Sequence, residues 1–272
     1  MKNVLRADFF DLRKSKMVWI LPIGAVALGI LLPMMYYGIF SLFRYLASLD
    51  AAKNNSTMVT MNRVLGMLNA RTVFFGSLPI SEGFGLMLTA MLGFRAARPF
   101  ATGVYRNKIV AGISRPAIYL SQFLLCLLLA AVSAALYTLA TALTSRLTFG
   151  ALNLSGKEIL TVAILSFGIY LVYTAIPVFL AFFTQSTPLA LIVSMLLPIL
   201  MQTVISLLTP VLLNKPDVVM YVLAAFPTFQ GAYMSNAGGD TTVMLIAIGA
   251  DVLWAALLTL FGVLRFTKAD MK

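Results

Sequence analysis

Long apolar runs separated by short polar segments are the feature that most constrains this chain. Each run is long enough to cross the ~30 Å hydrocarbon core of a bilayer as a helix rising ~1.5 Å per residue. Hydrophobic residues make up 61% of the chain and charged residues 11%, more apolar surface than a soluble domain of this size can bury. The sequence therefore predicts an all-α membrane protein, a six-helix transmembrane bundle in which residues 1–272 form a single domain. The expected spans lie near 17–40, 74–94, 117–143, 159–183, 189–213 and 242–266.

The polar segment before the first span has helical periodicity. Leu5, Phe9 and Leu12 recur at a spacing that places them on one helical face, while basic residues occupy much of the rest. Residues 1–16 are therefore expected to form an amphipathic helix on the cytoplasmic membrane surface. A signal peptide is the alternative, and the length and acidic residues of this region disfavour it.

The segment before the last span, 214–240, holds an apolar stretch at 218–234 that Pro227 and Gly231 interrupt. It is too short and broken for a comfortable span. We expect outer re-entrant helices here, with a seventh span as the alternative.

The distribution of Lys and Arg predicts the orientation. Of the 20 basic residues, 13 fall in segments on the inner side and seven on the outer side if the N-terminus is inside, as the positive-inside rule requires. A multi-pass protein of the cell (cytoplasmic) membrane with both termini cytoplasmic is expected. The same rule explains the net charge of +11, so a nucleic-acid partner is not expected.

The sequence lacks the residues that several kinds of catalytic and metal-binding site require. The chain has no histidine and a single cysteine, Cys126, which disfavours metal sites and Ser-His-Asp catalysis. The Gly156-Lys157 pair lacks the upstream glycine of a phosphate-binding loop, and Glu158 follows it instead of Ser or Thr. We therefore expect no enzyme, no metal and no cofactor bound by this chain.

Residues 95–116, between the second and third expected spans, contain five basic residues and no acid. The middle of this segment is expected to form a short helix ended by Gly112. Ser114 and Pro116 then mark the start of the next helix. On charge alone, an ordinary positive-inside loop is the favoured interpretation of this segment.

The motif in this segment resembles the signature of the type-2 ATP-binding-cassette (ABC) permease family, as does the plan of spans. In that family the segment is a cytoplasmic coupling helix that docks into a groove on a separate ATPase. The resemblance implies that the same role falls to Phe100, Gly103, Arg106, Asn107, Lys108, Gly112, Ser114 and Arg115.

The resemblance also implies an assembly and a function. The chain would be the permease subunit of an ATP-driven exporter, with two ATPase copies holding ATP and Mg, and a second permease subunit completing a homo- or heterodimer. Membrane lipid surrounds such a bundle. A hydrophobic compound or peptide is the expected substrate.

Two carboxylates fall within expected spans, Glu82 and Asp251. A carboxylate at bilayer depth is costly and by default suggests a function. Glu82 could have a function in the membrane, or it could reach water or cap a short outer helix. Asp251 could face a substrate pathway or pair with a basic group of another helix. An ion-coupled secondary transporter that uses both residues is therefore the alternative function. The lack of histidine and of clustered acids disfavours an intramembrane enzyme.

Overall fold

The computed structural model describes residues 2–50, 69–78, 84–212, 221, 223–227, 230 and 241–268, and this part is helical, without a strand. The all-α prediction is therefore confirmed for the described part of the chain. The helices are α1 (Lys2–Lys14), α2 (Met17–Asp50), α4 (Ala70–Ser77), α5 (Phe84–Ala101), α6 (Val104–Val110), α7 (Arg115–Phe149), α8 (Gly156–Thr184), α9 (Thr187–Leu212) and α12 (Thr241–Lys268).

Within the described residues, four helices are long and apolar enough to cross a membrane: Val18–Leu46 of α2, and all of α7, α8 and α12. Only 22% of the most apolar window is buried in α2 and in α12, against 56% in α8. Large side chains such as Trp19 and Leu147 are 67% and 79% exposed. Apolar surface on this scale fits a lipid surrounding, so the chain is a membrane protein.

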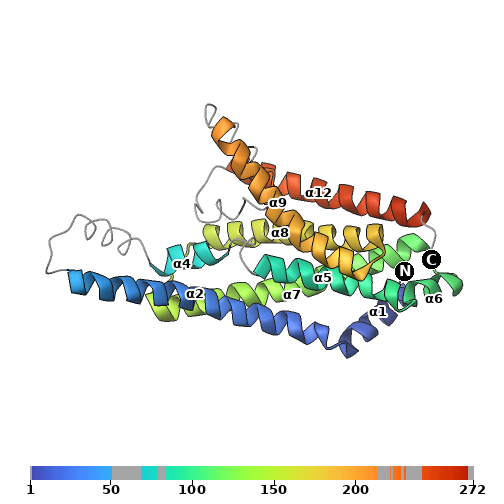
Figure 1. The fold of residues 1–272 in the computed structure, drawn as a ribbon, viewed down its shortest axis with the longest axis horizontal. Coiled ribbons are helices and arrows are strands. Elements are labelled where there is room, and N and C mark those ends of the chain that lie inside the picture. Colours follow the sequence, from blue (N-terminus) through green and yellow to red (C-terminus); the bar gives the residue numbers. More distant parts are fainter. Residues whose placement is uncertain are drawn as a thin grey trace.

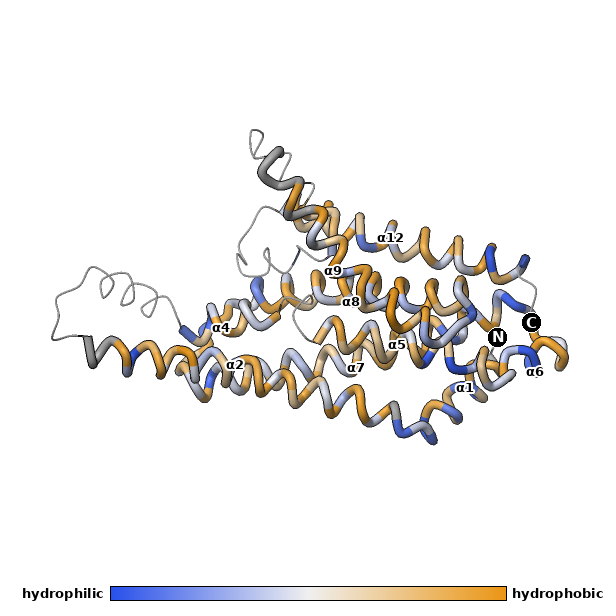
Figure 2. The backbone as a smooth tube through the Cα atoms, viewed as in Figure 1, coloured by the Kyte–Doolittle hydropathy of each residue, from blue (hydrophilic) through white to orange (hydrophobic). Residues whose placement is uncertain are grey.

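Helix α8 occupies the centre of the bundle, where it contacts α5, α7, α9 and α12. Helix α2 packs along α7, and α9 packs along α5. Figure 1 shows α2, α5, α7, α8 and α12 lying roughly along one axis, with α9 inclined to them and with α1 and α6 together at one end. We call this end, with the start of α7 and the end of α12, the α6 end. Figure 2 shows polar residues gathered on α1 and α6.

Small residues allow the helices to approach closely. A Cβ atom at Gly29 of α2 would lie 2.8 Å from the carbonyl oxygen of Tyr137 in α7. One at Gly93 of α5 would lie 2.9 Å from Oγ of Ser194 in α9. Such positions exclude larger side chains, which is typical of helix contacts in membranes.

The expected span 74–94 is not one helix. Helix α4 ends at Ser77, and α5 begins separately at Phe84. The hydroxyl of Tyr137 in α7 donates a hydrogen bond to the Ser77 carbonyl oxygen, which satisfies a helix-terminal acceptor. The span was predicted as one helix because its hydropathy is high enough over 74–94, although Pro79 and the glycines near it are residues that often interrupt helices.

Helix α1 packs against the bundle through a face that shares only Leu12 with its expected apolar face. Val4, Asp8 and Leu12 are buried, at a spacing of four residues, whereas Phe9 is 49% exposed. Asp8 is buried because it finds polar partners in the bundle, as described below.

Most of 214–240 lies outside the described residues, and so does 51–68. The expected re-entrant helices and the alternative seventh span both fall mainly on that part. The expected span 189–213 corresponds to α9, within which Thr187–Met201 forms a shorter apolar stretch.

Candidate functional site

Helix α6 is a short helix held between two sharp turns. Gly103 precedes it with φ +70°, and Gly112 follows it with φ +82°. Residues other than glycine rarely adopt this left-handed backbone. Ser114 then caps α7, which has Pro116 in its first turn. The short helix, its glycine end and the start of α7 are confirmed as the sequence predicted them.

The inner face of α6 is anchored by Tyr105. Its side chain is 1% exposed, and its hydroxyl donates a 3.0 Å hydrogen bond to the Ala96 carbonyl oxygen in α5. Burial raises the pKa of the Tyr105 phenol well above its usual value, so the hydroxyl stays a neutral donor.

The Tyr105 ring lies inside what we call the aromatic cluster. Its centroid is 4.6 Å from that of Phe100 and 5.1 Å from that of Phe182. These contacts connect α6 to α5, α7, α8 and α12, because each helix contributes one ring to the cluster. The members are Phe100, Tyr105, Tyr119, Phe182 and Phe266.

Helix α1 is tied to α6 through Asp8. One carboxylate oxygen of Asp8 forms an ion pair with Nζ of Lys108, and the other accepts a 2.6 Å hydrogen bond from the Ser121 hydroxyl in α7. The side chains of Asp8 and Lys108 are 6% and 16% exposed. Both charges therefore interact across a medium with little water, where attraction is stronger than at a surface.

Arg115 ties the start of α7 to the end of α12. Its guanidinium donates hydrogen bonds to the carbonyl oxygens of Phe266, at 3.2 Å, and Thr267, at 2.9 Å. A cation is favoured at a helix C-terminus, where carbonyl groups lack intrahelical donors. Arg115 thus connects two long helices of the bundle. The resemblance had implied a contact with the ATPase for this residue.

The outer face of α6 is exposed and has basic character. Arg106 and Asn107 are exposed, and Val110 is 82% exposed. Among the described residues, Arg106 takes part in neither of the two ion pairs. The helix thus has a fixed inner face and an outer face with a cation, an amide and an apolar side chain available for contact.

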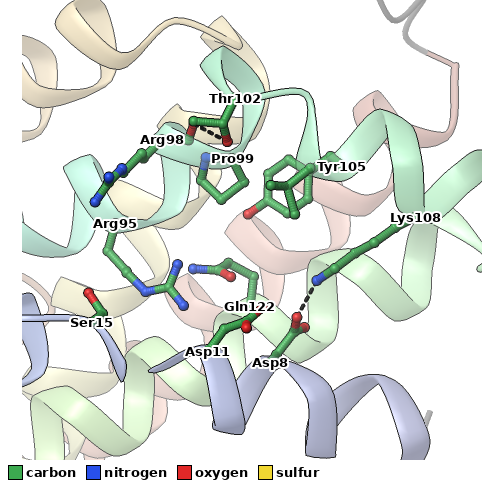
Figure 3. Close-up of a pocket in the computed structure, with 11 residues that line it drawn as sticks. Asp8, Asp11, Ser15, Arg95, Arg98, Pro99, Thr102, Tyr105, Lys108 and Gln122 are labelled. Atoms are coloured by element: carbon green, nitrogen blue, oxygen red, sulfur yellow. Dashed lines mark hydrogen bonds and ion pairs between the residues drawn. The ribbon is translucent and has the colours of Figure 1, made fainter. Parts of the chain in front are cut away.

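A cavity of about 300 Å³ lies beside α6, between α1, α5 and α7. Figure 3 shows the Arg95 side chain reaching into it toward Gln122 and Asp11. Nε of Arg95 is buried and has no hydrogen-bond partner in the described part of the chain. The cavity is therefore polar on one side, and it adjoins the ion pair between Asp8 and Lys108.

A family model described as a protein of unknown function, DUF2705, matches residues 84–272. The chain belongs to the DUF2705 family. The match begins with α5, so the family region contains α6, the aromatic cluster and α12. Helices α1 and α2 precede it. No curated protein matches this DUF2705 chain.

The structure brings the expected coupling residues of the DUF2705 chain into one place but gives them different environments. Gly103 and Gly112 shape the turns, Arg106 and Asn107 face outward, and Lys108 is held by α1. The exposed set is thus smaller than the motif. Residues that the sequence did not single out complete the site: Asp8, Tyr105, Tyr119, Ser121, Phe182 and Phe266.

Asp251 lies elsewhere in the DUF2705 bundle. It is fully buried and accepts a 3.0 Å hydrogen bond from Nε2 of Gln230. Its second carboxylate oxygen has no partner among the described residues, and no basic side chain there lies within 4.0 Å. Fifteen residues of α12 separate it from Phe266, about 22 Å along a helix, so it is not part of the α6 site.

Glu82, the other expected intramembrane carboxylate, lies outside the described residues. The described part of the chain contains no group of three or more His, Cys, Asp or Glu side chains that could hold a metal ion. The α6 site is made up of the aromatic cluster, the ion pair between Asp8 and Lys108, and the exposed basic outer face of α6.

Proposed function

We propose that this chain is the membrane-spanning permease subunit of an ATP-driven ABC exporter, with α6 as the coupling helix. The observation that supports the proposal best is the two-sided character of α6. On its inner face, Tyr105 packs in the aromatic cluster with rings from four other helices, and its outer face presents Arg106, Asn107 and Val110. A force applied to the outer face by a partner passes directly into the bundle.

In this proposal the partner is a separate ATPase that binds ATP and Mg, present in two copies with two permease subunits. ATP binding favours one of two arrangements of the partner, and contact with α6 makes one packing of the bundle more stable than the other. Because the aromatic cluster joins α5, α7, α8 and α12, a shift of α6 displaces the ends of all four helices together.

The proposed topology has six spans, re-entrant outer helices before α12 and both termini in the cytoplasm. The Lys and Arg distribution supports it. Helix α5 has 18 residues and would extend about 27 Å, close to the thickness of the hydrocarbon core. A hydrophobic compound or peptide is the proposed substrate, and apolar side chains such as Met201 and Trp254 line a small hollow between α8, α9 and α12.

Charge reversal at Arg106 tests the assignment of α6. We expect Arg106→Glu to lower binding of the co-expressed ATPase, and the ATP hydrolysis of the complex, by tenfold or more. The physical reason is that a rim cation that meets a complementary surface becomes a repulsive contact. The measurement is co-purification together with the ATPase rate of the complex in lipid.

Arg13→Glu is the matched control, because Arg13 is also exposed but lies on α1, away from the outer face of α6. It should leave both quantities within about twofold of wild type, as is usual for changes away from an interface. Equal effects of the two substitutions, or an ATPase that binds Arg106→Glu normally, would contradict the coupling role.

An ion-coupled secondary transporter is the second candidate, and the buried Asp251 supports it. A carboxyl group with one hydrogen bond from Gln230 and a free second oxygen in the described structure can take up and release a proton. For this candidate we expect transport driven by a pH gradient without an ATPase, reduced at least tenfold in Asp251→Asn. The exporter predicts no such transport, so reconstituted vesicles with an imposed pH gradient separate the two.

A further inference from the structure

A second hollow lies next to the cavity of Figure 3, at the corner where α1 meets α2. It has a volume of about 520 Å³, within the range of roughly 300–1,000 Å³ of small-molecule sites. Asp11, Ser15 and Arg98 line both spaces. The hollow is open, and it lies between the α1–α2 corner and one side of α5.

Three cations line this hollow: Lys14 and Lys16 from the α1–α2 corner, and Arg98 from α5. None of them takes part in the two ion pairs of the described structure. Lys14 lies 4.3 Å from the centre of the Phe10 ring, so Lys16 and Arg98 are the less engaged of the three. Asp11 is the one acid among the lining residues, which leaves an excess of positive charge.

The remaining wall of the hollow is apolar. Ile20, one turn into α2, and Met91 and Phe94 of α5 line it. Ile20 is 51% exposed, and the next turn of α2 exposes Ile23 at 63%. The hollow therefore leads from charged side chains directly onto the apolar outer surface of the bundle, where lipid tails lie.

This arrangement points to a bound anionic phospholipid, and we propose that its phosphate group occupies this hollow, held by Lys14, Lys16 and Arg98. One acyl chain would run along Ile20, Met91 and Phe94. The phosphate of a phospholipid would contact the cations and its acyl chain would cover the apolar wall, whereas a free phosphate would leave the apolar wall uncovered. Clusters of Lys and Arg at the end of a span are suited to anionic headgroups. The proposal does not depend on the ATPase partner.

The site has a consequence for α6. Arg98 lies on the last turn of α5, just before the turn at Gly103 that leads into α6. Lys14 and Lys16 lie at the end of α1, whose Asp8 holds Lys108. A lipid phosphate between them would connect α1 to α5, in addition to the ion pair between Asp8 and Lys108 that connects α1 to α6, and so hold the α6 end together.

Lipid binding to the purified full chain tests the proposal. Native mass spectrometry would compare retention of phosphatidylglycerol and phosphatidylcholine by wild type, by Lys16→Gln/Arg98→Gln, and by Arg98→Lys. We expect phosphatidylglycerol to be retained in preference, and the double variant to bind it roughly 25-fold more weakly, about fivefold for each charge removed. Arg98→Lys keeps the charge and should keep most of the affinity.

The control variant is Arg6→Gln/Arg13→Gln, which removes two charges from the other side of α1, where they line a separate hollow. It should retain phosphatidylglycerol like wild type. Equal loss in both double variants would overturn the proposal, because it would indicate diffuse attraction to a basic protein. Equal retention of the two lipids would also overturn it. Added inorganic phosphate in large excess should leave the lipid bound, and complete release would indicate a free-phosphate site instead.

Discussion

Tyr105→Ala should destabilise the chain by roughly 3–5 kcal/mol, the usual cost of removing a buried aromatic ring. The ring is 1% exposed and contacts Phe100 and Phe182, so its removal leaves a cavity where the helices of the α6 end meet. For a chain of this size we expect the melting temperature in detergent to fall by roughly 10 °C.

Two control variants separate the contribution of the ring from that of the hydroxyl group and from the general effect of changing a side chain on α6. Tyr105→Phe keeps the ring and removes only the hydrogen bond to the Ala96 carbonyl oxygen, which should cost about 1 kcal/mol. Val104→Ala changes a side chain of the same helix that is 37% exposed, and its effect should stay within about 0.5 kcal/mol. A Tyr105→Ala protein as stable as Val104→Ala would show that the ring does not hold α6.

The same substitution distinguishes binding of a partner from transmission of its movement. The outer face with Arg106 and Val110 is unchanged in Tyr105→Ala. If the proposed function is correct, the ATPase should still co-purify with Tyr105→Ala, whereas stimulation of ATP hydrolysis by substrate should be largely lost. Arg106→Glu should have the opposite pattern, with loss of binding itself.

Asp8→Asn should be the second strongly destabilising change, at about 2–3 kcal/mol. Removing one member of a buried ion pair costs roughly 3–5 kcal/mol because the other charge is left uncompensated. The smaller figure applies here because the Lys108 side chain is 16% exposed and can turn toward solvent. Thermal unfolding of the purified protein measures the effect.

A double-mutant cycle with Lys108→Gln isolates the pair itself. Residues in direct contact usually show coupling of about 0.5–3 kcal/mol, and we expect about 2 kcal/mol here. Asp11→Asn is the matched control: Asp11 is exposed, lies almost one turn further along α1, and takes part in neither ion pair of the described structure. Zero coupling, or equal effects of Asp8→Asn and Asp11→Asn, would contradict a structural role for the pair.

Local signals in the sequence predicted much of the helix plan. The expected span 117–143 lies within α7, and 159–183 lies within α8. Gly112 after α6 and Ser114 with Pro116 at the start of α7 marked helix boundaries, because these residue types are favoured at helix ends by their own local backbone preferences. Such signals act over a few residues and are therefore visible in the sequence.

Contacts between distant segments were not predictable in this way. Asp8 and Lys108 are 100 residues apart, and nothing near either of them indicates the other. Tyr105 lies in a helix of seven residues, too short for periodicity to show which side faces inward. The break between α4 and α5 likewise depends on packing against α7.

The sequence by itself determined that this is a helical membrane protein with a short basic helix between two longer ones, because hydropathy and cap residues act locally. Only the tertiary structure decided which side of that helix is anchored. The bundle provides an aromatic cluster for Tyr105 and a counter-charge for Lys108, and it leaves Arg106 outside. Burial depends on which side chains meet in space, and those pairings arise only when the helices pack.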